Sequence, residues 1–254
     1  MESTSRITAL NVLNVIAYVA NVLIVYGIGV GGLIDGLPTN AELSEKYQTL
    51  ITPIGWSFSI WGVIFISQFI FALVQLFAPF RSHPLVVSGV KRTYIGVCLA
   101  QIGWTLAFSY EIIWLSLTAM LLILSLLITI LMAQYKIVDV TVRDYILLKF
   151  PFAIHAGWIV AASFVNGSVL LVDRNTGDEL QYYTALGSLL AILLIAALAL
   201  SISRPEYVVP LVLSWASVRQ LFQRDYSSQK TINPPFPSVP RWASSLSWTT
   251  RKMR

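Results

Sequence analysis

The hydrophobic positions of this chain gather into long uninterrupted runs rather than into short alternating ones. A helix needs about 20 apolar residues to cross the hydrocarbon core of a bilayer, whereas a membrane-spanning strand needs only about ten alternating residues. The runs therefore predict helices, which satisfy their backbone hydrogen bonds within one segment. Six runs are long enough: Ile7–Gly31, Ile54–Phe77, Val90–Tyr110, Ile112–Gln134, Ile146–Val172 and Tyr182–Ser203.

A seventh apolar stretch, Tyr207–Val218, contains Pro210 and is followed by Arg219. It is too short for a full span, and its length suits a re-entrant or interfacial helix. The first run is too long for the apolar region of a removable signal peptide, so we expect it to stay as a membrane helix. The pattern as a whole predicts an all-α, polytopic transmembrane helix bundle with six spans and a short seventh helix.

Composition supports the membrane class and excludes several others. Hydrophobic residues make up 56% of the 254 residues and charged residues only 11%, against about 25% charged residues in soluble domains. This argues against a cytosolic enzyme and against a disordered protein. The net charge of +5 rests on few charges, and a nucleic-acid partner would need basic residues clustered on a soluble fold. We therefore expect a lipid bilayer as a partner and no nucleic acid.

The charges are distributed unevenly between the two sides that six spans define. The side that holds the N-terminus carries 15 of the 17 basic residues and five acids, while the opposite side keeps Lys46 and Arg174 with seven acids. The positive-inside rule places the N-terminus and the C-terminal tail on the cytoplasm-like side. The same rule disfavours a seventh full span, because that span would put the basic tail on the acidic side.

Composition changes abruptly near residue 222, so we predict a helical bundle over residues 1–221 and a basic, proline-rich tail over 222–254. The segment 231–240 holds four prolines, which exclude a regular helix. Trp242, Trp248 and a basic end follow. Two interpretations are open: a surface tail with membrane anchors, or an extended arm that docks on a protein partner.

Aromatic and polar side chains inside the spans are the candidate site residues, because buried polar groups in lipid need a partner or a function. Trp56, Phe58 and Trp61 open the second run; they form either an interfacial aromatic belt or a wall on which a ligand stacks. Gln101, Trp104 and Phe108 share a face of the third run by helical spacing.

The fifth run carries His155, Trp158 and, eight residues later, Asn166. A lone intramembrane histidine is a functional candidate, although hydrogen-bonded packing is the favoured interpretation of His155. No partner at metal-ligand spacing accompanies it, so a metal site is not expected. The sequence has no nucleophile elbow, P-loop or paired intramembrane carboxylates, and we expect no enzymatic activity.

Three segments, Pro53–Phe65, Gln101–Phe108 and Pro151–Asn166, resemble in order and spacing the TspO/translocator-protein family, also called tryptophan-rich sensory proteins. The resemblance covers residues 7–220 and is closest to a longer branch with an extra C-terminal helix. Gln101 stands where the family pattern usually has Asn, and His155 where it usually has Tyr. The resemblance implies a five-helix core, here with a sixth helix added, around an apolar pocket.

The resemblance also implies a function. The family binds porphyrins, sterols or related hydrophobic ligands, and nine residues of this chain would line the pocket: Trp56, Phe58, Trp61, Gln101, Trp104, Phe108, His155, Trp158 and Asn166. The expectation is a membrane protein that binds or transports a hydrophobic small molecule. A bound tetrapyrrole or lipid is the candidate cofactor. The alternative is a structural accessory subunit of a respiratory or photosynthetic complex in a mitochondrial or plastid membrane, with residues 222–254 docked on its partners.

Overall fold

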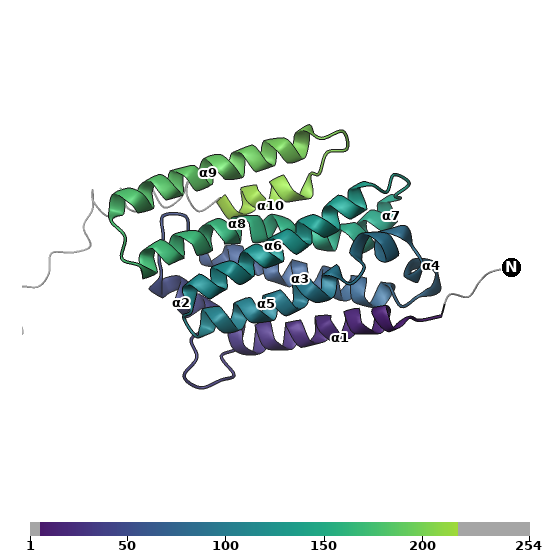
Figure 1. Cartoon of the computed structure of the whole chain (residues 1–254), viewed down its shortest axis with the longest axis horizontal. Coiled ribbons are helices and arrows are strands. Elements are labelled where there is room, and N and C mark those ends of the chain that lie inside the picture. The colour runs from purple at the N-terminus through teal and green to yellow at the C-terminus, as the bar shows by residue number, and fades with distance from the viewer. Residues whose placement is uncertain (1–5, 218–254) are drawn as a thin grey trace, which may run out of the picture. The chain divides into compact units, whose positions relative to one another are not determined.

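A computed structural model of the chain describes residues 6–217, and the predicted tail, 222–254, lies outside the described residues. Every regular element in that range is helical (Figure 1). The α-helices are α1 (Ala9–Ile24), α2 (Asn40–Lys46), α3 (Ile60–Val74), α4 (Ala78–Arg81), α5 (Thr93–Ser109), α6 (Ile113–Tyr135), α7 (Val142–Asp144), α8 (Phe150–Asp173), α9 (Asp178–Ser201) and α10 (Val208–Ser217). Four short segments have π or 3-10 geometry: η1 (Val25–Val30), η2 (Gly55–Ser59), η3 (Leu85–Val90) and η4 (Tyr145–Lys149).

The helices confirm the predicted polytopic membrane bundle. Within residues 6–217, five helical segments are long and apolar enough to cross a membrane: Ala9–Val30, Gly55–Val74, Ile113–Tyr135, Val142–Asp173 and Asp178–Ser201. The third predicted run yields the shorter helix α5, of 17 residues. Lys91, with a φ of 50°, and Arg92 separate α5 from η3. The seventh stretch forms α10, whose ten described residues extend about 15 Å, which is less than a full span needs.

Five helices form a closed ring. Helix α1 packs against α3 and α5, α5 packs against α6, α6 packs against α8, and α8 returns to α3. Helices α9 and α10 lie outside this ring and both contact α8, with α10 between α9 and α8 (Figure 1). The arrangement is the predicted five-helix core with a helical hairpin added to one of its faces.

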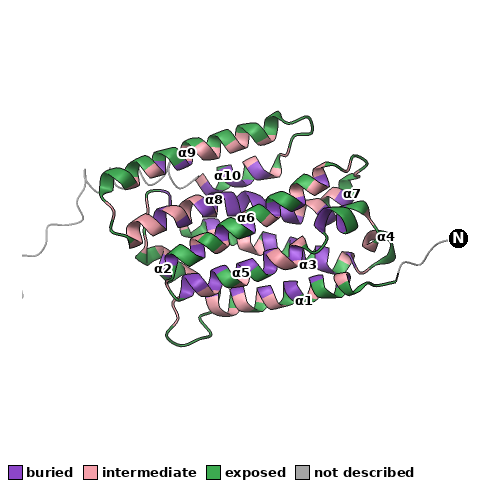
Figure 2. Ribbon diagram, in the orientation of Figure 1, coloured by how far each residue is buried: buried purple, intermediate pink, exposed green. Residues whose placement is uncertain are grey.

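Burial follows this arrangement (Figure 2). Helix α8 is covered on several sides, and every residue from Pro151 to Ala161 is buried. Helix α9 is the opposite case, because only Ala185 and Ser188 of its 24 residues are buried. Its exposed leucines match a helix that faces hydrocarbon. A membrane-embedded helical protein of this kind contacts the lipid bilayer.

The π segments η3 and η4 meet through one buried glutamine. Pro151 has no N–H to donate to the preceding turn, which is where η4 interrupts the ordinary helical ladder. The Nε2 of Gln134 donates hydrogen bonds to the carbonyl oxygens of Leu148 at 2.8 Å and Leu85 at 3.5 Å. Gly89 admits this side chain, since a Cβ there would lie 2.6 Å from the Gln134 Cγ. The Gln134 amide thus donates hydrogen bonds to carbonyl groups of the two π segments, η3 and η4.

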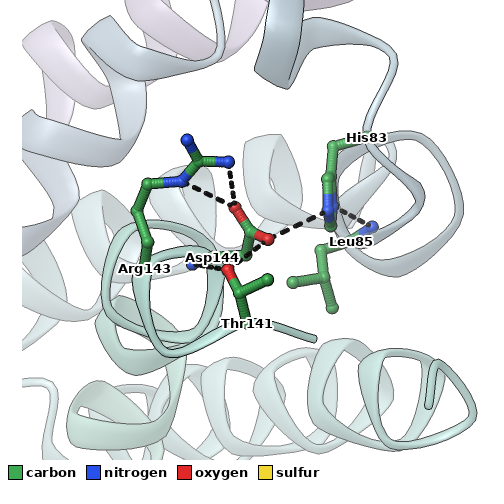
Figure 3. A network of polar contacts seen from close by, with 5 residues as sticks. All are labelled: His83, Leu85, Thr141, Arg143 and Asp144. Atoms are coloured by element: carbon green, nitrogen blue, oxygen red, sulfur yellow. Dashed lines mark hydrogen bonds and ion pairs between the residues drawn. The ribbon is translucent and has the colours of Figure 1, made fainter. Parts of the chain in front are cut away.

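A polar network fixes the basic end of the bundle (Figure 3). Thr141 caps α7: its hydroxyl accepts a hydrogen bond from the backbone N–H of Asp144 at 3.2 Å and donates to the Asp144 carboxylate at 2.6 Å. Arg143 pairs with the same carboxylate at 3.2 Å, and the Nε2 of His83 faces it at 3.7 Å. The network joins the loop after α4 to α7, and it lies at the end of the bundle where α1 begins in Figure 1.

Candidate functional site

Four of the predicted site residues lie together where α3 and its entry segment η2 face α8. We call Phe58, Trp61, His155 and Trp158 the tryptophan cluster. The Trp158 ring centroid lies 5.7 Å from that of Phe58 and 6.2 Å from that of Trp61, both edge to face. Trp61 lies 5.8 Å from His155 and stacks on Phe65 at 5.4 Å. Such edge-to-face geometry is favourable for aromatic pairs, and it gathers broad apolar ring surface within one part of the bundle.

His155 belongs to a chain of polar groups that crosses three helices. The Tyr94 hydroxyl donates to Oε1 of Gln68 at 3.2 Å, and Nε2 of Gln68 lies 2.8 Å from Nδ1 of His155. Because the Gln68 NH₂ group faces Nδ1, that nitrogen accepts and the ring proton resides on Nε2. The Nε2 atom has no hydrogen-bond partner among residues 6–217. His155 is therefore held by packing and one hydrogen bond, and its Nε2–H has no acceptor among the described residues.

Gln101, Trp104 and Phe108 share the inner face of α5, as their spacing predicts. Trp104 and Phe108 stack with ring centroids 5.3 Å apart, and Gln101 accepts a hydrogen bond from Asn21 of α1 at 3.4 Å. Three buried atoms of this group find no partner within the described part of the chain: Gln101 Nε2, Asn21 Oδ1 and Trp104 Nε1. Unsatisfied buried polar atoms are costly in an apolar medium, so this face can accept polar groups of a ligand.

Asn166 and Trp56 have partners outside the tryptophan cluster. The Oδ1 of Asn166 accepts a hydrogen bond from the Ser116 hydroxyl of α6 at 3.1 Å, which is an interhelical contact. Trp56 is 46% exposed, and its ring centroid lies 4.6 Å from that of Trp215 in α10. The nine predicted residues therefore fall into three sets. Four form the tryptophan cluster, and Gln101, Trp104 and Phe108 lie together on α5. Trp56 and Asn166 contact residues outside both sets.

A short helix and an ionic contact cover the acidic end. Thr39 caps the N-terminus of α2: its hydroxyl accepts from the Glu42 N–H, and the Glu42 carboxylate accepts from the Thr39 N–H. This reciprocal pair is a capping box. Leu43 of α2 is fully buried, so the first loop inserts an apolar side chain into the end of the bundle.

The first loop is also tied to the turn between α5 and α6. Lys46 forms an ion pair with Glu111, and the Tyr47 hydroxyl donates to the same carboxylate at 2.6 Å. The Lys46 and Tyr47 contacts lower the pKa of Glu111 below its ordinary value. Desolvation, together with the Glu111 hydrogen bond, raises the pKa of Tyr47 to about 12. We call this set the loop clamp.

Within residues 6–217, no three His, Cys, Asp or Glu side chains gather closely enough to hold a metal ion. Sequence reasoning also missed three residues with a structural part in the site, namely Gln68, Tyr94 and Trp215. Gln68 could have been identified from the sequence, because it is a polar residue within an apolar run. Trp215 could not have been identified in this way, because its hydrogen-bond partner Ser57 is more than 150 positions away in the chain.

A comparison with known protein families identifies the family of this chain. The model of the family described as TSPO-like protein matches residues 11–233. The chain belongs to the TSPO-like family. No curated protein and no solved structure matches the chain.

The family match extends beyond the five-helix ring of this TSPO-like protein. Residues 11–233 include α9 and α10, so the added hairpin lies within the matched region. The first five predicted runs supply the ring, and the sixth supplies α9. The chain is an integral membrane protein of the TSPO-like family whose ring carries a helical hairpin on α8.

Proposed function

We propose that this TSPO-like protein binds, and passes through the membrane, a hydrophobic ligand of the tetrapyrrole or sterol and lipid class, without catalysing a reaction on it. The tryptophan cluster carries this proposal. Its rings present flat apolar surface inside the bundle, and such surface suits a planar or fused-ring ligand. A ligand that is hydrophilic over most of its surface fits poorly, because the surrounding helices are lined by apolar side chains.

The unpartnered polar atoms support the same proposal. The Nε2–H of His155, the Nε2 of Gln101 and the Nε1–H of Trp104 are buried donors without a partner in the described residues. Carbonyl, carboxylate or hydroxyl groups on an otherwise apolar ligand are the complement of these donors. A few polar groups in a mostly apolar surrounding are typical of small-molecule sites.

Titration of the purified full-length protein with protoporphyrin IX tests the proposal. The porphyrin absorbance band is the readout, because it does not depend on the tryptophans that are removed. We expect the Trp61→Ala/Trp158→Ala double variant to weaken binding at least about tenfold, since each substitution deletes aromatic stacking. Trp114→Ala is the matched control, because Trp114 is 55% exposed on α6. Equal affinity of the double variant and the wild type would refute the site.

A second function is favoured by the exposure of α9. Nearly all of this apolar helix is uncovered within the described chain, which suits a subunit that packs against other membrane proteins as well as one that faces lipid. In this alternative the protein is an accessory subunit of an organellar complex, and residues 222–254 dock on its partners. Deleting 222–254 would then remove partners that co-purify with the full chain, whereas unchanged co-purification would refute the alternative.

A further inference from the structure

Helix α10 is docked along α8 by three sets of contacts. At its base, Glu206 accepts hydrogen bonds from the Tyr145 hydroxyl at 2.8 Å and from the backbone N–H of Val208 at 3.2 Å. The same carboxylate forms an ion pair with Lys149 at 3.2 Å. All these groups are at least partly buried. The base of α10 is therefore held firmly at the basic end of α8.

The middle of α10 lies against α8 at unusually close range. A Cβ at Gly157 would lie 2.9 Å from the Cβ of Val212 and 3.2 Å from the Cα of Val209. Only glycine permits this approach without a shift of one helix. The buried residues of α10 are Val209, Val212, Leu213 and Ala216, which is the spacing of one helical face.

The tip of α10 reaches the entry of α3. The indole Nε1–H of Trp215 donates to the backbone oxygen of Ser57 at 3.1 Å, and its ring packs edge to face on Trp56. Ser57 is completely buried, and its hydroxyl has no partner in the described part of the chain. The tip thus rests on the segment that leads into the tryptophan cluster, through one hydrogen bond and one ring contact.

The two ends of α10 are held unequally. The base has an ion pair and two hydrogen bonds centred on one carboxylate, whereas the described hydrogen bond from the tip to another element is the one that Trp215 donates to Ser57. A helix of ten residues has little stability of its own, so its position depends on these contacts. Trp56 and Trp215 are 46% and 39% exposed, so the contact between them lies at the surface of the bundle. Loss of the tip contacts would let α10 swing away about its base.

We propose that α10 is a self-docked cover hinged at Glu206, whose Trp215 packs against Trp56 and leaves it when a hydrophobic ligand enters between α3 and α8. The entry role rests on the proposed function; the cover itself does not. Trp215 acts as a built-in competitor for the aromatic surface of Trp56. The covered segment, Ser57 to Phe58, then becomes reachable from the side of the bundle.

The first test measures, in the absence of ligand, how strongly α10 shields position 57 from a thiol reagent. Ser57→Cys is introduced into the full chain with Cys98→Ala, and its reaction with a small maleimide is followed in lipid nanodiscs. Adding Trp215→Ala removes one hydrogen bond and one ring contact, and we expect about tenfold faster labelling. Leu211→Ala is the matched control, because Leu211 lies on the same helix and is 70% exposed; its labelling rate should equal that of the parent.

The second test measures entry, with protoporphyrin IX as the probe and its association rate as the readout. Trp215→Ala should accelerate association about tenfold, Trp215→Phe less, since it keeps a ring, and Leu211→Ala not at all. Unchanged Ser57→Cys labelling in Trp215→Ala would overturn the cover. Faster labelling with an unchanged porphyrin rate would overturn its role in entry. If neither wild type nor Trp215→Ala binds porphyrin, the proposed function fails, while the labelling result still decides the cover.

Discussion

At the scale of single residues, the membrane core of this protein contains polar side chains that form hydrogen-bonded pairs. Ser116 bonds Asn166, Asn21 bonds Gln101, and Gln68 lies between His155 and another helix. In a low-dielectric interior, losing one partner of such a pair costs more than losing both. The pairs therefore fix how the helices are rotated against one another.

The Gln68 contact gives a prediction at this scale. Gln68→Leu leaves Nδ1 of His155 without its hydrogen bond and removes one hydrogen bond of the Tyr94 hydroxyl, and we expect the free energy of unfolding to fall by about 1–3 kcal/mol. Denaturant titration in detergent micelles measures the change. Replacing both partners in Gln68→Leu/His155→Leu should restore part of the loss. Ser125→Ala on the exposed face of α6 is the control, and additive losses in the double variant would contradict the pairing.

At the scale of elements, close approach and capping decide which helices touch. Gly157 sets the distance between α8 and α10, and Leu43 with the loop clamp fixes the first loop on the acidic end. Both contacts join segments far apart in the sequence. Each is controlled by one or two side chains, so each can be disturbed without touching the rest of the fold.

Two alanine substitutions in α8 should have opposite signs. Gly157→Ala forces α10 outward, and such overpacking should destabilise the protein by about 1–3 kcal/mol. Gly167→Ala has nothing within 4 Å of the new Cβ, and it should stabilise the helix by about 0.5–1 kcal/mol because alanine restricts the unfolded chain. Thermal unfolding of the two variants is the measurement. A stabilising Gly157→Ala would show that α10 is not packed on α8.

The loop clamp predicts a pH dependence of the first loop. The pKa of Glu111 is lowered in the folded state by Lys46 and Tyr47, so the stabilisation is fully present above the ordinary pKa of 4.5 and is lost as pH falls through the lower folded value. The protection factors of residues 40–47 against amide hydrogen exchange should fall over that acidic window. Glu111→Gln should show fast exchange already at neutral pH, while Glu179→Gln, which is exposed, should behave as the wild type.

At the scale of the whole molecule, the charges separate along the bundle. The N-terminal end, α4 and α7 lie at one end of the described structure in Figure 1, with α2 and the turn after α8 at the other. The basic residues Arg81, Arg143 and Lys149 belong to the first end, and the acids Glu42 and Glu111 to the second. This separation is the condition under which the positive-inside rule assigns an orientation.

The predicted orientation can be measured by labelling single cysteines with a membrane-impermeant maleimide in the intact cells or isolated intact organelles whose membrane holds the protein. In a Cys98→Ala background, Glu45→Cys should react before the membrane is permeabilised, and Ser82→Cys only afterwards. Both positions are exposed in the structure, so the comparison depends on the side of the membrane alone. The reverse order of labelling would contradict the charge argument.

The spans were predictable because apolar length is a local property of the sequence, and five of the six predicted runs appear as helices long enough to cross a membrane. Irregular geometry was less accessible. The break at Lys91 and Arg92 shortened the third helix, and the capping of α2 by Thr39 was not predicted. Such details depend on one or two backbone dihedral angles, which hydrophobicity does not encode.

The grouping of the site residues was predictable only in part. The spacing of Gln101, Trp104 and Phe108 placed them on one face of one helix, since three- and four-residue steps share a face. Which residues of different helices meet does not follow from spacing. Trp56 was expected beside Trp61 and Trp158, yet its described ring contact is Trp215. Asn166 was expected to face a ligand, and it bonds Ser116.

The sequence by itself determined that this protein is a bundle of membrane helices, which residues are polar within it, and how charge divides between its two ends. These properties follow from chain length, apolar content and residue order alone. Only the tertiary structure decided which aromatic rings meet, that Gln68 partners His155, and that α10 lies on Gly157 with Trp215 over Ser57. These contacts depend on the rotation and distance of packed helices, which are set by side chains that lie far apart along the chain.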